Sequence, residues 1–183
     1  MKIKILIPIY NDWQSADKLI NEIDNLVKEI NHEFSLVIVN DGSSEIKPDG
    51  FGYSENLNSV QILNIKKNMG HARCIATGLK HIFQNDEFDY IIPMDGDGED
   101  RPEEIKIFID NLSYNPDTTI VGERVKRSEG IIFKLSYSIH KLITFIFTGK
   151  SIKFGNYTFL PKKTVEKLIN CLLYTSPSPR DKH

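Results

Sequence analysis

The sequence predicts an α/β protein with three layers, in which a mostly parallel sheet is covered by helices on both faces. Apolar runs typical of buried strands alternate along the chain with segments whose apolar residues have helical spacing. With 183 residues, 40% of them hydrophobic, the chain is long enough to bury one sizeable core and short for two domains. Polar clusters follow several of the predicted strands, at the edge where such sheets bind ligands.

Strands and helices alternate from the first residues onward. Residues 2–10 form an apolar run that predicts a buried strand, and residues 15–30 carry apolar side chains at helical spacing. Further strands are predicted at 34–39 and 60–65, and a second helix at 71–84. The first half of the chain is therefore built from the units that form parallel sheets.

A predicted strand at 90–94 leads into an acidic segment and a third helix. Asp100 fits the N-cap of this helix, Pro102 fits its first turn, and Glu103 stands three residues after the cap. This signature predicts the start of the helix to within about two residues. A further short strand is predicted at 118–122.

Charge and composition exclude several classes of protein. The 23 Lys and Arg against 25 Asp and Glu give a net charge of −2, so we expect no nucleic-acid partner. Cys74 and Cys171 show neither metal-ligand nor disulfide spacing, which favours a reduced, cytoplasmic compartment. No run reaches the roughly 20 apolar residues that span a bilayer, and the first residues do not fit a signal peptide. No GxGxxG follows the first strand, which disfavours a dinucleotide oxidoreductase.

The segment at 131–147 is apolar on most of its circumference. One interpretation is a helix packed into the core. The other is a surface helix that touches a membrane or a lipid substrate, which would bring a full-length protein to the cytoplasmic face of a membrane. The sequence leaves both open.

Four carboxylates follow the predicted strand at 90–94 within six positions: Asp95, Asp97, Glu99 and Asp100. Their mutual repulsion would raise their pKa values or cost stability unless a cation lies among them. Oxygen-only ligands suit Mg²⁺ or Mn²⁺, and the intervening Gly96 and Gly98 let a phosphate approach the backbone. The alternative is a solvated acidic turn before a helix.

Three motifs together resemble a known family. Asp41-Gly42-Ser43 follows the second strand, residues 68–73 (NMGHAR) open the second helix, and residues 94–103 (MDGDGEDRPE) hold the acidic turn. Their order and spacing resemble glycosyltransferase family 2, most closely its bacterial branch near dolichol- and polyprenyl-phosphate sugar synthases. The likeness covers nearly the whole chain up to about Leu168, with further matches at 121–124, 127–130 and 154–156.

The resemblance implies a GT-A fold, in which the nucleotide of a sugar donor lies across the first half of the sheet. It implies that Asp41 hydrogen-bonds the base of the nucleotide. The residues implied for binding the nucleotide-diphosphate sugar are Pro8, Tyr10, Asn11, Asp12, Asp41, Asn68, Gly70, Arg73, Asp95 and Gly96. Many relatives have glutamate at the position of Asp12, which is shorter.

The resemblance also implies a divalent cation, Mg²⁺ or Mn²⁺, held by Asp95, Asp97 and Glu99, although relatives often have glutamine at the last position. The implied reaction inverts the anomeric carbon, and the cation stabilises the diphosphate leaving group. We assign catalytic roles to Asp97, Arg124 and Arg127; the two arginines fit phosphate binding, or are ordinary surface charges. No Glu-Asp pair that would supply a general base follows the acidic turn, which favours an ionised acceptor such as a polyprenyl phosphate.

Some residues have two interpretations. His71 and Arg73, at the start of the second helix, are placed to touch the diphosphate, but for His71 the sequence favours capping or solvent exposure. Trp13 either flanks the base or packs in the core.

We predict a catalytic domain at residues 1–171, truncated at its C-terminus, followed by a disordered tail at 172–183. The Ser-Pro-Ser-Pro run of the tail cannot extend a helix and departs from the family. An alternative function is a nucleotide-sugar or metal-binding module without catalysis. A nucleotidyltransferase is disfavoured, because no Gly-rich loop with a basic residue lies between Ile7 and Ser15.

Overall fold

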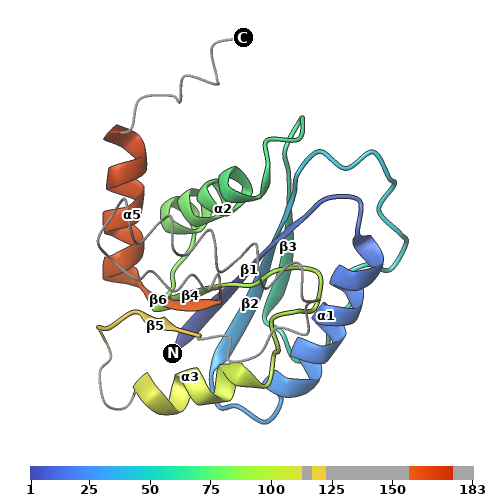
Figure 1. Ribbon diagram of the computed structural model, residues 1–183. Coiled ribbons are helices and arrows are strands. Elements are labelled where there is room, and N and C mark those ends of the chain that lie inside the picture. The colour runs from blue at the N-terminus through green and yellow to red at the C-terminus, as the bar shows by residue number, and fades with distance from the viewer. Residues whose placement is uncertain (113–116, 123–156, 175–183) are drawn as a thin grey trace, which may run out of the picture.

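The fold is a six-stranded sheet flanked by helices on both faces (Figure 1). The computed structural model describes residues 1–112, 117–122 and 157–174, without the side chains of the last four. The elements in chain order are β1 (Lys2–Ile9), α1 (Trp13–Val27), β2 (Glu33–Asn40), β3 (Ser59–Asn64), α2 (His71–Asn85), β4 (Tyr90–Pro93), α3 (Glu104–Leu112), β5 (Ile120–Val121), β6 (Thr158–Pro161) and α5 (Lys162–Tyr174).

The strand order is β3-β2-β1-β4-β6-β5. The first four of these strands run parallel, while β6 is antiparallel to both β4 and β5. The parallel half of the sheet therefore ends its strands at one edge, and the loops that leave β1, β2 and β4 lie there together (Figure 1). That edge holds the polar clusters that the sequence places after the strands.

Both faces of the sheet are buried, which is why its central strands appear as continuous apolar runs. On one face Ile3, Ile5 and Ile7 of β1 pack in a core with α1 and α3. On the other face Leu6 of β1 packs with Leu79 of α2 and with residues of α5. The α/β class and the three-layer arrangement predicted from the sequence are confirmed.

The predicted start of the third helix is wrong. Helix α3 begins at Glu104, four residues after the predicted N-cap. The Asp100 carboxylate instead accepts a hydrogen bond from the Asp95 N–H at 2.9 Å, and Asp100 is only 3% exposed. It closes the acidic loop rather than capping the helix. The intervening residues form turns in which the Glu104 N–H donates to the Arg101 carbonyl at 3.1 Å.

The C-terminal part differs from expectation in two ways. Strand β6 was not predicted, because its four residues are too few to show a period. Helix α5 runs to Tyr174, three residues past the predicted end of the domain at 171, because the first proline of the following run comes only at Pro177. The segment at 131–147 lies outside the described residues, so both interpretations of it stay open.

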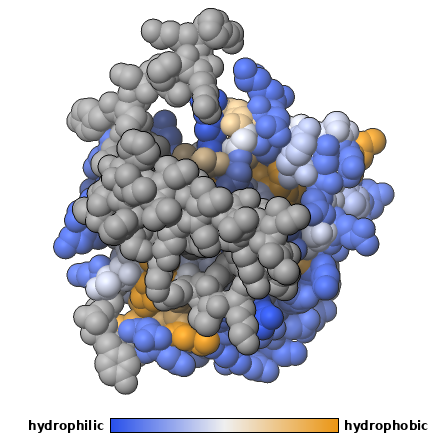
Figure 2. Space-filling view, in the orientation of Figure 1, coloured by the Kyte–Doolittle hydropathy of each residue, from blue (hydrophilic) through white to orange (hydrophobic). Residues whose placement is uncertain are grey.

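Within the described ranges, no helix is both long and apolar enough to cross a membrane. The surface that these ranges contribute to one side of the molecule is mostly hydrophilic (Figure 2). Large apolar side chains that are well exposed are scattered over different elements, among them Ile46 at 92%, Tyr53 at 69% and Ile107 at 60%. Scattered apolar residues of this kind are normal on a protein surface.

Candidate active site at the carboxyl edge of the sheet

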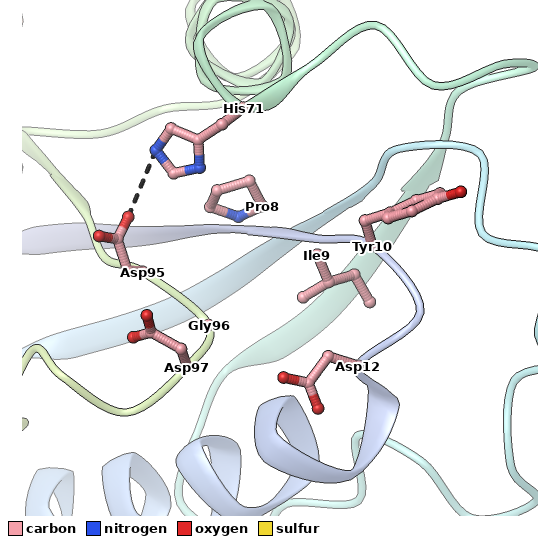
Figure 3. A pocket seen from close by; sticks show the side chains of 8 residues that line it. All are labelled: Pro8, Ile9, Tyr10, Asp12, His71, Asp95, Gly96 and Asp97. Carbon is pink, nitrogen blue, oxygen red and sulfur yellow. Dashed lines mark ion pairs between the residues drawn. The ribbon is translucent and has the colours of Figure 1, made fainter.

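A pocket of about 350 Å³ opens at the carboxyl ends of β1 and β4 (Figure 3). Three segments far apart in the sequence form it: the end of β1 with its loop, the first residue of α2, and the acidic loop after β4. The lining residues are Pro8, Ile9, Tyr10, Asp12, His71, Asp95, Gly96 and Asp97. Tyr10 is 51% exposed at the mouth, so its ring is open to a ligand.

The acidic loop is held in shape by its own carboxylates. Asp100 accepts from the Asp95 N–H at 2.9 Å, and Asp97 Oδ1 accepts from the Glu99 N–H at 2.9 Å. The Asp95 carboxylate lies across the pocket from His71, with Oδ1 3.3 Å from the imidazole Nε2 (Figure 3). His71 therefore links the start of α2 to the loop after β4.

The glycine between the two pocket aspartates lies in close contact with the end of β1. A Cβ on Gly96 would lie 3.2 Å from the Pro8 carbonyl oxygen and 3.2 Å from Cγ2 of Ile9. Without a side chain at that position the acidic loop lies directly against the end of β1. This packing brings Asp95 and Asp97 to the same pocket as Tyr10.

The pocket suits an oxygen-preferring divalent cation with two protein ligands. Asp95 and Asp97 both line it, whereas Glu99 does not. Among the residues that the structure describes, no three His, Cys, Asp or Glu side chains converge on a metal position. Mg²⁺ is commonly held by one or two carboxylates together with substrate phosphates and water, so two aspartates facing one cavity fit such an ion when a diphosphate shares it.

Asp41, predicted to contact the base, also binds the turn that leads into α2. Its two carboxylate oxygens accept hydrogen bonds from the Met69 N–H at 2.7 Å and the Gly70 N–H at 2.8 Å, and the residue is 4% exposed. The thiol of Cys74 also donates to Asp41. Burial of Cys74, together with this hydrogen bond and the negative charge of Asp41, raises the pKa of the thiol to about 12.

Asn11 likewise joins two loops. It adopts a left-handed conformation with φ of 53°, and its side-chain oxygen accepts from the Ser44 N–H at 2.8 Å and the Glu45 N–H at 3.1 Å. The Asn11 N–H donates to Ser43 Oγ at 2.9 Å. Asn11 therefore fixes the loop after β1 against the loop after β2. Local hydrogen bonding of this kind is what makes asparagine tolerate the left-handed region.

The structure brings together half of the residues predicted for the sugar nucleotide. Those that line the pocket are Pro8, Tyr10, Asp12, Asp95 and Gly96, while Asn11, Asp41, Asn68, Gly70 and Arg73 do not. The predicted catalytic residue Asp97 lines it too; Arg124 and Arg127 lie outside the described residues.

Two residues with open interpretations are now placed. Trp13 packs: its ring meets Phe51 edge-on at 5.0 Å, its Nε1–H donates to the Glu45 carbonyl at 3.1 Å, and it is 4% exposed. His71 lines the pocket and its side chain is 49% exposed, so the predicted solvent exposure and the predicted place beside the diphosphate site both describe it. The sequence feature that could have indicated a pocket role for His71 is the Gly70-His71 pair, which opens a helix after a strand. The pocket residue Ile9 has no such feature, because it continues the apolar run of β1.

Comparison with known proteins identifies the family. The sequence profile of glycosyl transferase family 2 matches residues 4–167. The undecaprenyl-phosphate 4-deoxy-4-formamido-L-arabinose transferase of Proteus mirabilis is 27% identical over 176 residues, which are 94% of this chain and 51% of that protein. The chain thus spans about half the length of this relative.

Solved structures share the fold. Mannosyl-3-phosphoglycerate synthase of Rubrobacter xylanophilus superposes with a TM-score of 0.61 at 13% identity, over 89% of this chain and 54% of that one. The mannosyltransferase PcManGT of Pyrobaculum calidifontis, solved with GDP-Man and Mn²⁺, superposes with a TM-score of 0.55 at 14% identity, over 91% and 46%. These likenesses establish the GT-A fold, and with the profile match they show that this chain belongs to glycosyl transferase family 2.

Proposed function

We propose that this protein transfers a sugar from a nucleotide-diphosphate donor, with inversion and with help from Mg²⁺ or Mn²⁺, onto a polyprenyl-phosphate acceptor. The observation that carries the proposal is the pairing of Asp95 and Asp97 with Tyr10 around one pocket at the carboxyl edge of a parallel sheet. Ligands of such sheets bind at this edge. Family membership supports sugar transfer, and the name of the Proteus relative supports a polyprenyl-phosphate acceptor.

We assign different roles to the pocket residues according to their side chains. Asp95 and Asp97 would hold the cation, with the remaining positions filled by diphosphate oxygens and water. When bound, the cation stabilises the charge that develops on the diphosphate as the bond to the sugar breaks. The exposed Tyr10 ring offers a face on which the base can stack. Asp12 both lines the pocket and accepts the Ser15 N–H at 3.2 Å, so it orients the start of α1 as well.

An acceptor that attacks through a phosphate oxygen needs no general base. A phosphate oxygen is already ionised at neutral pH, whereas a hydroxyl must lose a proton as it attacks. We retain Arg124 and Arg127 as the proposed ligands of the acceptor or donor phosphate, because a guanidinium group binds phosphate through two parallel hydrogen bonds.

The proposal is tested by calorimetric titration with UDP- and GDP-sugars, each with and without Mn²⁺. We expect one donor to bind at least about tenfold more tightly with the cation, and Asp97→Asn to lose this gain. Asparagine keeps an oxygen for the Glu99 N–H, so the loop retains its shape. Asp49→Asn, which removes an exposed carboxylate from a distant loop, is the matched control and should bind as the wild type does.

Two results would contradict the proposal: binding that is indifferent to the cation, or an Asp97→Asn variant with unchanged cation dependence. A second assay follows sugar transfer to polyprenyl phosphate, together with hydrolysis of the donor in water. Donor binding without either reaction would favour the alternative, a nucleotide-sugar-binding module without catalysis.

A further inference from the structure

The acidic loop, residues 95–100, is anchored at its two ends and exposed in its middle. At the start, the Met94 N–H donates to a carbonyl of β1 at 2.9 Å, which continues the pairing of β4 with β1. At the end, Asp100 is 3% exposed and its carboxylate accepts from the Asp95 N–H at 2.9 Å. Asp97 lies between these anchors and is exposed. The direction in which Asp97 faces therefore depends on both ends of the loop.

The second anchor is extended by a tyrosine that directly precedes β6. The Tyr157 hydroxyl donates to the Arg101 carbonyl at 3.0 Å, across 56 residues of sequence. Arg101 follows Asp100 directly, and its carbonyl also accepts at 3.1 Å from the N–H of Glu104, where α3 begins. The hydroxyl therefore holds the backbone at the point where the acidic loop passes into α3.

Tyr157 is itself fixed in place. It is 3% exposed, and its ring meets Phe108 of α3 edge-on at 4.9 Å. Its backbone carbonyl accepts from the N–H of Gly122, directly after β5, at 2.8 Å. Burial raises the pKa of Tyr157, and the nearby charge of Asp100 raises it further, so the hydroxyl keeps its proton and remains a donor.

We propose that Tyr157 is a positioning residue for the acidic loop: its hydroxyl holds the Arg101 carbonyl so that Asp100 stays on the Asp95 N–H and Asp97 faces the pocket. Strands β5 and β6 then support the site, although their described residues do not line the pocket. The consequence for cation and donor binding rests on the function proposed above. The consequence for the loop does not, because its contacts exist without any donor.

The loop is tested by hydrogen exchange of assigned backbone amides in the donor-free protein. Tyr157→Phe removes only the hydroxyl and keeps the ring against Phe108, so the variant should fold. We expect the Asp95 amide, whose acceptor is Asp100, to exchange about three- to tenfold faster, the effect of losing one hydrogen bond. The Met94 amide, bound within the sheet, should exchange as in the wild type. An unchanged Asp95 amide, or an equal acceleration at Met94, would overturn the proposal.

Tyr90→Phe is the matched control for these rates. Tyr90 is also a buried tyrosine, 7% exposed, and its ring meets Phe159 of β6 at 4.8 Å. It begins β4, at the end of the strand away from the acidic loop. Its replacement should leave the Asp95 amide unchanged. If Tyr90→Phe accelerated that amide as much as Tyr157→Phe does, the effect would reflect a loosened core and the proposal would fail.

Cation dependence shows whether Tyr157 acts through the cation site. Wild type and Tyr157→Phe are titrated with UDP and GDP, each with and without Mn²⁺. We expect the diphosphate that binds to lose about three- to tenfold in affinity when Mn²⁺ is present and to keep its affinity when Mn²⁺ is absent. In an Asp97→Asn variant, which already lacks a cation ligand, Tyr157→Phe should have no further effect.

Unchanged affinity in Tyr157→Phe with Mn²⁺ would overturn the proposal, and so would an equal loss with and without Mn²⁺ or an equal loss in the Asp97→Asn variant. If the wild type binds neither diphosphate, or binds one without regard to Mn²⁺, it is the proposed function that fails. The exchange rate of the Asp95 amide then still decides whether Tyr157 positions the loop.

Discussion

Replacement of Gly42 by alanine should cost far more stability than the same replacement at Gly50. Both glycines have left-handed backbones, with φ of 69° and 78°, so both variants pay the penalty of a side chain in that region. The left-handed conformation costs alanine about 1–2 kcal/mol of stability, and the lower entropy of the unfolded chain offsets about 0.4–1 kcal/mol of this cost. We therefore expect Gly50→Ala, whose Cβ meets nothing within 4 Å, to cost about 1 kcal/mol.

Gly42→Ala adds a steric term that Gly50→Ala lacks. Its Cβ would lie 2.7 Å from the Lys67 carbonyl carbon and 2.8 Å from the Asn68 nitrogen, both backbone atoms that cannot rotate away. Overpacking of this kind costs typically about 1–3 kcal/mol, so the total should be about 2–4 kcal/mol. The displaced segment leads to the turn held by Asp41, and we expect donor affinity to fall as well.

The two free energies of unfolding are measured by urea denaturation, followed by far-ultraviolet circular dichroism. This signal is preferable to fluorescence, because the single tryptophan packs on Phe51, next to Gly50. Equal costs for Gly42→Ala and Gly50→Ala would refute the reasoning, since only the contact with residues 67–68 distinguishes them. Loss of donor affinity in Gly50→Ala would also contradict it.

Two further predictions concern groups away from the pocket. The Cys74 thiol is fully buried and its pKa is raised to about 12, so it should not react with iodoacetamide at pH 8 in a Cys171→Ser variant until urea is added. Rapid labelling of the native protein would contradict the burial of Cys74. Asp24→Ala should cost about 1–3 kcal/mol at pH 7, because three backbone N–H groups lose their acceptor. Burial opposes ionisation of Asp24, but these N–H groups outweigh it and lower its pKa below the ordinary 3.8, so its contribution is complete above that pH and is lost as the pH falls below it. Urea titrations should thus show the cost shrinking below about pH 4; a cost that is constant from pH 7 to pH 3 would contradict this assignment.

The elements that the sequence predicted well are those whose pattern is local. Strand β1 is buried on both faces and therefore appears as an unbroken apolar run, and α1 shows its buried side at helical spacing. The convergence of Tyr10 and Asp95 was predictable, because parallel strands end at one edge of the sheet.

The rest depended on contacts between distant segments. Asp100 matches an N-cap, but its carboxylate accepts from the Asp95 N–H, and no periodic pattern in the sequence distinguishes these two roles. Asp41 has the residue type expected of a base ligand, and its carboxylate also accepts from N–H groups 28 and 29 residues further on, a contact that the sequence does not indicate. Polar side chains that hold loops together and polar side chains that hold ligands look alike in a sequence, because both use the same donors and acceptors.

The most direct test of the central claim is a crystal structure of the protein with a nucleotide-diphosphate sugar and Mn²⁺, with anomalous data collected at the manganese edge. We expect one anomalous peak between the carboxylates of Asp95 and Asp97, with the diphosphate beside it and the base near Tyr10. A manganese peak away from both aspartates, or a donor bound on another face of the sheet, would contradict it.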